Sequence, residues 1–258
     1  MSERRAAEVT IDAVLGGRLR LAQPRRGHRV GHDAILLAAS CPARAGERVI
    51  DLGAGVGAAG LALAARVDGV EVTLVEIDAD LAALAAANAE RNALAERVRV
   101  AVLDAAGPAR AFAAAGLGPE SVTRVLMNPP FNDPRRQRAS PDDRRRLAHS
   151  GTGGTLAAWV KTAARCLLPR GTLVLIWRAD GLADVLEALA PAFGAVTVLP
   201  VHGRANEAAI RVLVRATKGS RAPLALLPGL MLSDEAGHPT PEAEAVLRGA
   251  AILPLTEI

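Results

Sequence analysis

The chain has 258 residues, 50% of them hydrophobic and 22% charged, with a formal net charge of +4. This length suits one large α/β domain or two small ones; no apolar run approaches the roughly 18 residues that span a bilayer, and the first residues lack the apolar segment of a secretory signal. Cys41 and Cys166 are the only cysteines and lack metal-ligand spacing, so we expect a cytoplasmic, reduced protein without a metal site.

The first 42 residues form an arginine-rich segment and the start of a helix near His32. All but two of the 31 basic residues are arginine, and arginine is concentrated in two windows, residues 18–29 and 134–149. Such clusters attract phosphate backbones, although solvated surface charge is the alternative. The arginines that we predict to contact nucleic acid are Arg18, Arg20, Arg25, Arg26, Arg135, Arg136, Arg138, Arg144, Arg145 and Arg146.

From residue 43 to 217, short strand-like runs alternate with longer helical patterns rich in alanine and leucine. This alternation predicts an α/β fold, a mostly parallel sheet covered by helices on both faces. The predicted strands are 48–52, 70–77, 97–103, 122–127, 171–177, 195–201 and 208–216. The predicted helices are one that follows the glycine-rich turn and runs through about residue 66, and the segments 79–94, 153–168 and 181–192. The last two strands are close enough in sequence to pair as an antiparallel edge.

The last residues are rich in proline and leucine and end in a short helix. Thr240 is its expected N-cap, Pro241 lies in its first turn and Gly249 stops it. We interpret this stretch as a strap that packs on the same domain. The expected organisation is an N-terminal substrate and cofactor segment, a central domain and a C-terminal strap, covering residues 1–42, 43–217 and 218–258.

A glycine-rich turn, DLGAGVGAAG, follows the first strand of the central domain. Gly53, Gly55 and Gly57 let the backbone approach a ligand closely. The stretch also satisfies the dinucleotide pattern G-x-G-x-x-G, so it fits either NAD or S-adenosylmethionine. Glu76, at the end of the second strand, can accept hydrogen bonds from the ribose hydroxyls of either cofactor.

The other strand ends favour S-adenosylmethionine. Asp51 ends the first strand, where it can hold the amino-acid end of that cofactor, whereas it would repel the pyrophosphate of NAD. Asp104 ends the third strand, where it can reach the amine of an adenine. Because open α/β sheets bind ligands at the carboxyl ends of their strands, polar groups at four such ends indicate one S-adenosylmethionine site.

The fourth strand ends in Asn128-Pro129-Pro130-Phe131, next to the expected cofactor. A planar amine conjugated to a ring is a poor nucleophile because its lone pair is delocalised. The Asn128 side-chain oxygen and the Pro129 carbonyl can accept its two N–H bonds, Pro130 stiffens the geometry, and Phe131 offers a face for stacking. This predicts methyl transfer to a planar amine without a metal; the alternative is a proline pair that merely ends a strand.

With these motifs the chain resembles the class I S-adenosylmethionine-dependent methyltransferases, which have a Rossmann-like fold. Residues 15–40 and 209–232 are similar to the two ends of the bacterial tRNA1(Val) adenine-N(6) methyltransferase family. The resemblance implies that Asp33 lies beside the cofactor, as does Asn128, and that the substrate is an adenine in the anticodon loop of a tRNA, where extruding the base costs little.

Several alternatives stay open at the level of the sequence. Enzymes that methylate guanine amines in ribosomal RNA also carry NPPF, and methyltransferases for protein glutamine carry NPPY. A non-catalytic protein that binds S-adenosylmethionine and RNA, and an NAD-dependent oxidoreductase, are the alternatives from other classes.

Overall fold

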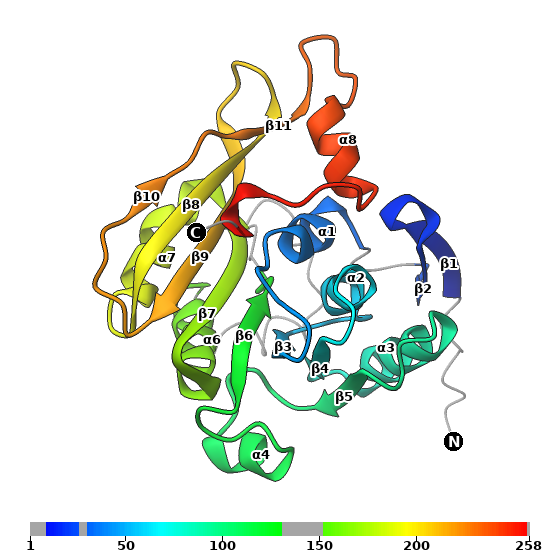
Figure 1. Cartoon of the computed structure of the whole chain (residues 1–258), viewed down its shortest axis with the longest axis vertical. Helices are drawn as coiled ribbons and strands as arrows, with labels where there is room; N and C mark the ends of the chain where they lie inside the picture. Colours follow the sequence, from blue (N-terminus) through cyan, green and yellow to red (C-terminus); the bar gives the residue numbers. More distant parts are fainter. Residues whose placement is uncertain (1–8, 26–29, 131–151, 257–258) are drawn as a thin grey trace, which may run out of the picture.

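The computed structural model describes residues 9–25, 30–130 and 152–256 (Figure 1). The strands of the central part are β3 (Arg48–Leu52), β4 (Glu71–Glu76), β5 (Val98–Val102), β6 (Val122–Met127), β7 (Leu167–Arg178), β8 (Phe193–Arg204) and β9 (Ala209–Lys218). The helices up to residue 217 are α1 (His32–Ala39), α2 (Ala58–Arg66), α3 (Ala79–Arg91), α4 (Ala109–Ala114), α6 (Thr152–Cys166) and α7 (Leu182–Leu189). Single 3-10 turns occupy Leu15–Gly17, Ala179–Gly181 and Pro254–Thr256.

The expected alternation of strands and helices is confirmed, with differences of up to four residues at the ends of several elements. β7 begins at Leu167 rather than at 171, because Leu167 pairs with Val122 of β6 before a register shift. α7 ends at Leu189 rather than at 192, just before Pro191, which has no backbone N–H to continue the helix. The short helix α4 was not predicted from the sequence.

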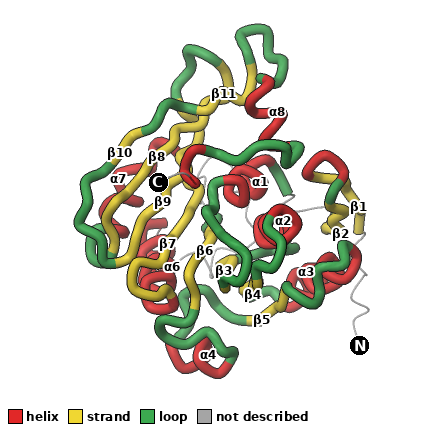
Figure 2. Tube along the Cα trace, in the orientation of Figure 1, coloured by secondary structure: helices red, strands yellow, loops and turns green. Residues whose placement is uncertain are grey.

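The elements after residue 218 complete one side of the sheet. They are β10 (Ala225–Leu226), β11 (Leu230–Ser233) and α8 (Pro241–Leu247). The nine-stranded sheet has the order β10-β8-β9-β7-β6-β3-β4-β5, and β11 also pairs with β8. Figure 2 shows these strands between helices on both sides.

The strands from β3 to β7 are parallel, as expected for a Rossmann-like sheet. The expected antiparallel pair is also present, because β8 and β9 pair antiparallel. The edge is more elaborate than predicted: β9 also pairs antiparallel with β7, so it lies inside β8, and β10 and β11 pair parallel with β8.

Each face of the sheet carries its own hydrophobic core. Helices α1, α2 and α3 contribute to one cluster of buried side chains, and α4, α6 and α7 contribute to the other. Strand residues alternate between them, so that Val49 belongs to the first cluster and Ile50 to the second. The predicted helices on both faces are therefore confirmed.

A hairpin that the sequence did not predict precedes α1. Its strands are β1 (Val9–Val14) and β2 (Leu19–Pro24), which pair antiparallel in a separate two-stranded sheet. The side-chain amides of Asn88 in α3 and of Asn92, which caps the end of that helix, bind the backbone of β2 as a neighbouring strand would. Asn88 accepts from the Ala22 N–H at 2.7 Å and donates to its carbonyl at 2.9 Å, and Asn92 binds Arg20 in the same way at 2.9 and 3.0 Å.

The C-terminal residues pack across β8 and α1. The Thr240 hydroxyl accepts from the Ala243 N–H at 3.1 Å and so caps α8, while Gly249 takes a left-handed φ of 74° after the helix, as predicted. Leu255 is buried in the first core cluster, and the Leu253 N–H donates to the Ala39 carbonyl at the end of α1. In the part of the chain that the structure describes, no helix combines the length and the apolar character that crossing a membrane requires.

Candidate functional site

The register of the sheet brings the predicted strand ends together. Leu52 of β3 lies opposite Val75 of β4 and opposite Met127 of β6. The residues that follow Leu52, Val75 and Met127 are Gly53, Glu76 and Asn128. The glycine turn therefore lies between the acidic end of β4 and the Asn-Pro-Pro stretch. The next pair, Glu76 and Val102, extends the same edge toward β5.

The glycine turn is folded back onto the end of β4. The N–H groups of Gly53 and Ala54 donate to the Val75 carbonyl at 2.8 and 2.9 Å, and the Gly55 N–H donates to the Glu76 carboxylate at 2.8 Å. Gly53, Gly55 and Gly57 have φ of 71°, 57° and 87°. These left-handed values explain why glycine occupies all three positions.

The glycines nevertheless face different surroundings. A Cβ built on Gly57 would lie 2.8 Å from Leu74 Cδ1, and one on Gly60 would lie 2.3 Å from Leu74 Cδ2, so these two glycines let α2 pack closely on β4. A Cβ built on Gly55 would meet no described atom within 4 Å. Gly55 therefore faces the open side of the turn, where a ligand can approach its backbone.

Glu76 is held rigidly at the edge of the sheet. It is only 7% exposed, one carboxylate oxygen accepts from Gly55, and the other accepts from the Asp78 N–H at 2.9 Å. Each oxygen keeps a second lone pair that can accept from a hydroxyl group. This geometry suits a carboxylate that binds the two hydroxyls of a ribose.

Two exposed apolar side chains lie beside Glu76, and the sequence reasoning missed them. Ile77, which follows β4, is 64% exposed, and Val102, the last residue of β5, is 57% exposed. At this edge they can cover the flat face of an adenine ring. Their type is common in any strand, so only their exposure in the folded chain marks them.

Asp51 is a buried carboxylate, 2% exposed, behind the turn. It accepts a hydrogen bond from the Gly60 N–H at 2.8 Å. Burial raises the pKa of Asp51 to about 7; the bond from Gly60 opposes this shift, and the charge of Glu76 adds to it. A cationic ammonium group nearby would favour its ionised form, so the residue suits the amino-acid end of S-adenosylmethionine.

The Asn128 stretch lies at the end of β6. The Asn128 side chain is half-buried, Pro129 is buried and Pro130 is exposed. Within the described ranges, no hydrogen bond joins the Asn128 side chain to another residue. Phe131 lies outside the described residues.

The remaining two predicted carboxylates stand farther along this edge. Asp104, beyond β5, is exposed and accepts from the Ala106 N–H at 2.8 Å. Asp33, in the first turn of α1, accepts a hydrogen bond from Arg211 Nε at 3.0 Å. In the sheet, Arg211 of β9 lies opposite Arg178, the last residue of β7. Asp33 therefore stands on the β7 and β9 side of the row that contains Gly53.

Only three of the predicted arginines lie in the described ranges. Arg18 donates to the carbonyls of Gly249 and Ala65 at 3.2 and 3.1 Å, so its guanidinium joins the hairpin to the C-terminal segment. Arg20 and Arg25 are exposed. Those outside the described residues are Arg26, Arg135, Arg136, Arg138, Arg144, Arg145 and Arg146.

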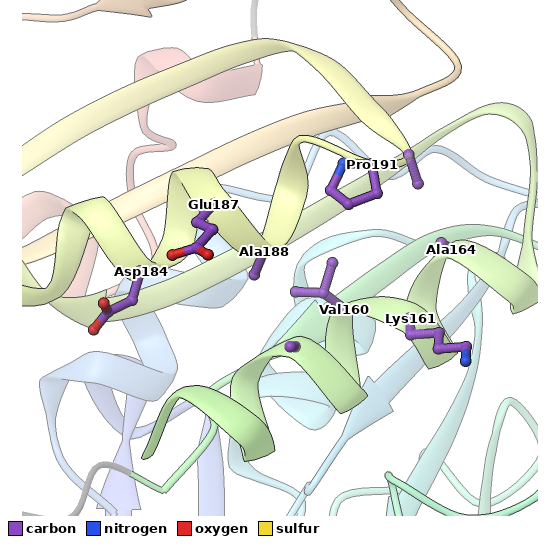
Figure 3. Close-up of a pocket in the computed structure, with 9 residues that line it drawn as sticks. Val160, Lys161, Ala164, Asp184, Glu187, Ala188 and Pro191 are labelled. Carbon is purple, nitrogen blue, oxygen red and sulfur yellow. The ribbon is translucent and has the colours of Figure 1, made fainter. Parts of the chain in front are cut away.

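A groove of ≈550 Å³ lies elsewhere, between α6 and α7 (Figure 3). Its lining residues come from these two helices and the turn that follows: Ala157, Val160, Lys161, Ala164, Asp184, Glu187, Ala188, Pro191 and Ala192. None of the strand-end groups lines it. Across the described ranges, no three His, Cys, Asp or Glu side chains cluster as a metal site would require.

The fold and the strand-end groups together define a class of protein. A mostly parallel sheet with a glycine turn after β3, a rigid carboxylate after β4 and Asn-Pro-Pro after β6 is the arrangement of a Rossmann-like, S-adenosylmethionine-dependent methyltransferase.

Comparison with known proteins gives the family. The methyltransferase small domain family matches residues 28–204. A tRNA1(Val) (adenine(37)-N6)-methyltransferase of Tolumonas auensis is 32% identical over 173 residues, which are 67% of this chain and 68% of that protein. A release factor glutamine methyltransferase of Chlorobaculum tepidum is 29% identical over 60% of this chain and 54% of that protein. The crystal structure of a predicted O-methyltransferase from Agrobacterium tumefaciens has a TM-score of 0.73 at 33% identity, covering 86% of this chain and 98% of that one.

The chain therefore belongs to the methyltransferase small domain family. It is a methyltransferase that uses S-adenosylmethionine, and the resemblance to the tRNA1(Val) enzymes is confirmed as similarity in sequence.

Proposed function

We propose that this protein methylates the exocyclic N(6) amine of an adenine in RNA, in the anticodon loop of a tRNA, and that it acts in the cytoplasm. The observation that carries the proposal is the row formed by Glu76, Gly53 and Asn128 at the carboxyl ends of β4, β3 and β6. In the proposal, this row holds a cofactor site and a hydrogen-bonding site for an amine side by side. The name of the relative from Tolumonas auensis supports the choice of tRNA.

On the Glu76 side of the row, the residues that would bind the cofactor are Asp51, Gly55 and Glu76. Glu76 would bind the ribose, the Gly55 backbone would approach the cofactor, and Asp51 would face its ammonium group. Asp104, Ile77 and Val102, at the end nearer β5, would surround the adenine. S-adenosylmethionine, when bound, supplies an electrophilic methyl group.

The amine side of the row consists of Asn128 and the prolines. The Asn128 side-chain oxygen and the Pro129 carbonyl would accept the two N–H bonds of the target amine, so that its lone pair points out of the ring plane toward the methyl donor. The two prolines restrict the backbone, which lowers the cost of orienting these acceptors. No strong base is required, because the nitrogen becomes acidic once it carries the methyl group.

The wider substrate site includes residues beyond the described ranges. In the proposal, Phe131 stacks on the target base, and the arginine clusters hold the phosphate backbone. Residues 1–42 and the arginines that follow Phe131 would contact the RNA together with the central domain of residues 43–217. Residues 218–258 would pack on that domain as a strap. Asp33 would lie beside the cofactor at the same edge, where its ion-pair partner Arg211 lies.

The test is a transfer assay with S-adenosylmethionine that carries a radiolabelled methyl group. Purified protein is incubated with tRNA, ribosomal RNA and protein extract from a strain that lacks the gene, each in a separate reaction. The RNA is then digested to nucleosides and separated by chromatography. We expect label in the tRNA fraction, released as N(6)-methyladenosine.

Other outcomes would contradict the proposal in distinct ways. Label in ribosomal RNA as a methylated guanosine, or only in protein, would keep the enzyme class and overturn the substrate. Absence of label in all three fractions, together with tight binding of S-adenosylmethionine, would favour a non-catalytic protein.

A further inference from the structure

Trp159 of α6 lies directly against the glycine turn. A Cβ built on Gly53 would lie 2.2 Å from Trp159 Cη2 and 2.6 Å from Cζ3, so the indole ring occupies the space beside the Gly53 backbone. Any other residue at position 53 would have to displace this ring. The φ of 71° at Gly53 makes the same position unfavourable for other residues, so two independent constraints fix glycine there.

Trp159 differs from the other aromatic residues of the chain. The sequence has three Phe, two Trp and no Tyr. Phe112, Phe193 and Trp177 are buried at 1%, 6% and 2% exposure. In the part of the chain that the structure describes, Trp159 is therefore the one aromatic side chain that is only partly buried. A core role alone does not require a large ring with an exposed portion at the edge of the sheet.

The ring and Asp51 flank the turn from opposite faces of the sheet. Asp51 binds Gly60 of α2, whose helix belongs to the first core cluster, whereas Trp159 packs against the second. Gly53 lies between them, and Asn128 follows the neighbouring strand β6. A ligand chain that crosses Gly53 would thus have a carboxylate on one side and an indole ring on the other.

We propose that Trp159 forms the wall that binds the amino-acid end of S-adenosylmethionine. The indole ring would pack against the methylene groups of that end and attract its ammonium group through the ring face. The ring would thereby align the methyl group with the amine held at Asn128. This inference rests on the cofactor site proposed above and adds a binding residue that the strand-end motifs do not contain.

The experiment compares two ligands that differ only at the amino-acid end. S-adenosylhomocysteine has this end, whereas 5′-methylthioadenosine has the same adenosine and thioether without it. Calorimetry is carried out with both ligands on the wild-type protein, Trp159→Leu, Trp159→Phe and Glu76→Gln. For Trp159→Leu we expect about tenfold weaker binding of S-adenosylhomocysteine and unchanged binding of 5′-methylthioadenosine, with Trp159→Phe in between.

Glu76→Gln separates a failure of this inference from a failure of the proposed site. Glu76 would bind the ribose that both ligands share, so both should bind more weakly to Glu76→Gln. If that variant binds both ligands as tightly as the wild type, the proposed site itself is wrong. If Glu76→Gln behaves as expected but Trp159→Leu weakens both ligands equally, or neither, the role of Trp159 is overturned.

A second readout does not depend on the folding of Trp159→Leu. In Trp177→Phe the ring of Trp159 is the only tryptophan left in the chain, since the sequence has two. S-adenosylhomocysteine should change its fluorescence, and 5′-methylthioadenosine at saturation should change it far less. Equal responses to the two ligands would contradict a contact with the amino-acid end.

Discussion

At the scale of single residues, Asp51 shows how burial sets the state of a candidate binding group. Its carboxylate is enclosed behind the glycine turn and receives one backbone hydrogen bond, from Gly60. Burial raises the pKa of Asp51 to about 7 from an ordinary value of 3.8. Without cofactor, the folded protein therefore keeps a proton on Asp51 between about pH 4 and about pH 7, where Asp51 of the unfolded chain has lost it.

This difference makes stability depend on pH. Because the folded state binds the extra proton, the contribution of Asp51 lowers the free energy of unfolding as pH rises from about 4 to about 7, by up to about 1.4 kcal/mol per pH unit. Asp51→Asn keeps an acceptor for Gly60 and cannot ionise. We expect it to be more stable than the wild type by an amount that grows between pH 5 and pH 7, measured by urea denaturation without cofactor. A difference that stays constant with pH would show that Asp51 ionises normally.

At the scale of elements, the hairpin of β1 and β2 depends on Asn88 of α3 and on Asn92, which caps the end of that helix. Asn88 is fully buried and also donates to the Val56 carbonyl at 3.0 Å, so it joins β2, α3 and the end of the glycine turn. Asn92 makes the matching pair of bonds to Arg20 but is only half-buried. The two residues thus form a natural comparison between a buried and a partly exposed amide.

Asn88→Ala should cost much more than Asn92→Ala. Removal of the Asn88 amide leaves the buried N–H of Ala22 and the carbonyl of Val56 without their partner, at about 1–3 kcal/mol each. We expect a loss of about 2–4 kcal/mol in the free energy of unfolding for Asn88→Ala and under about 1 kcal/mol for Asn92→Ala. Chemical denaturation of both variants checks this. Losses of equal size would mean that burial of the amide does not govern the contact.

The hairpin also shows which elements the sequence predicts poorly. Strands such as β3 and β6 were predicted with their observed bounds because short runs rich in valine, isoleucine and leucine mark buried parallel strands. β2 instead docks on side-chain amides that lie 66 and 72 residues away, a partner that no local pattern reveals. The turn residues Gly16 and Gly17, both with positive φ, were a signal that could have indicated the hairpin.

At the scale of the whole molecule, the candidate site is a shared edge rather than one segment. Its strand-end residues were predictable because parallel strands in one sheet must bring their carboxyl ends to the same edge. Contacts between segments were not predictable in this way. The ring of Trp159 against Gly53, the ion pair between Asp33 and Arg211, and the clasp of Arg18 on Gly249 each depend on how distant segments pack.

In the proposed function, the cofactor and the target amine bind to neighbouring but separate parts of this edge. Asn128→Ala tests it most directly, with binding of S-adenosylhomocysteine measured by calorimetry and methyl transfer to tRNA measured in the same preparation. We expect transfer to fall at least about a hundredfold, as for loss of one preorganised hydrogen-bonding group, while the affinity for the cofactor product changes less than about threefold. Glu96→Ala, an exposed residue before β5 at the opposite, amino-terminal edge of the sheet, is the control and should change neither. Equal losses of binding and transfer in Asn128→Ala, or transfer at the wild-type rate, would contradict the account.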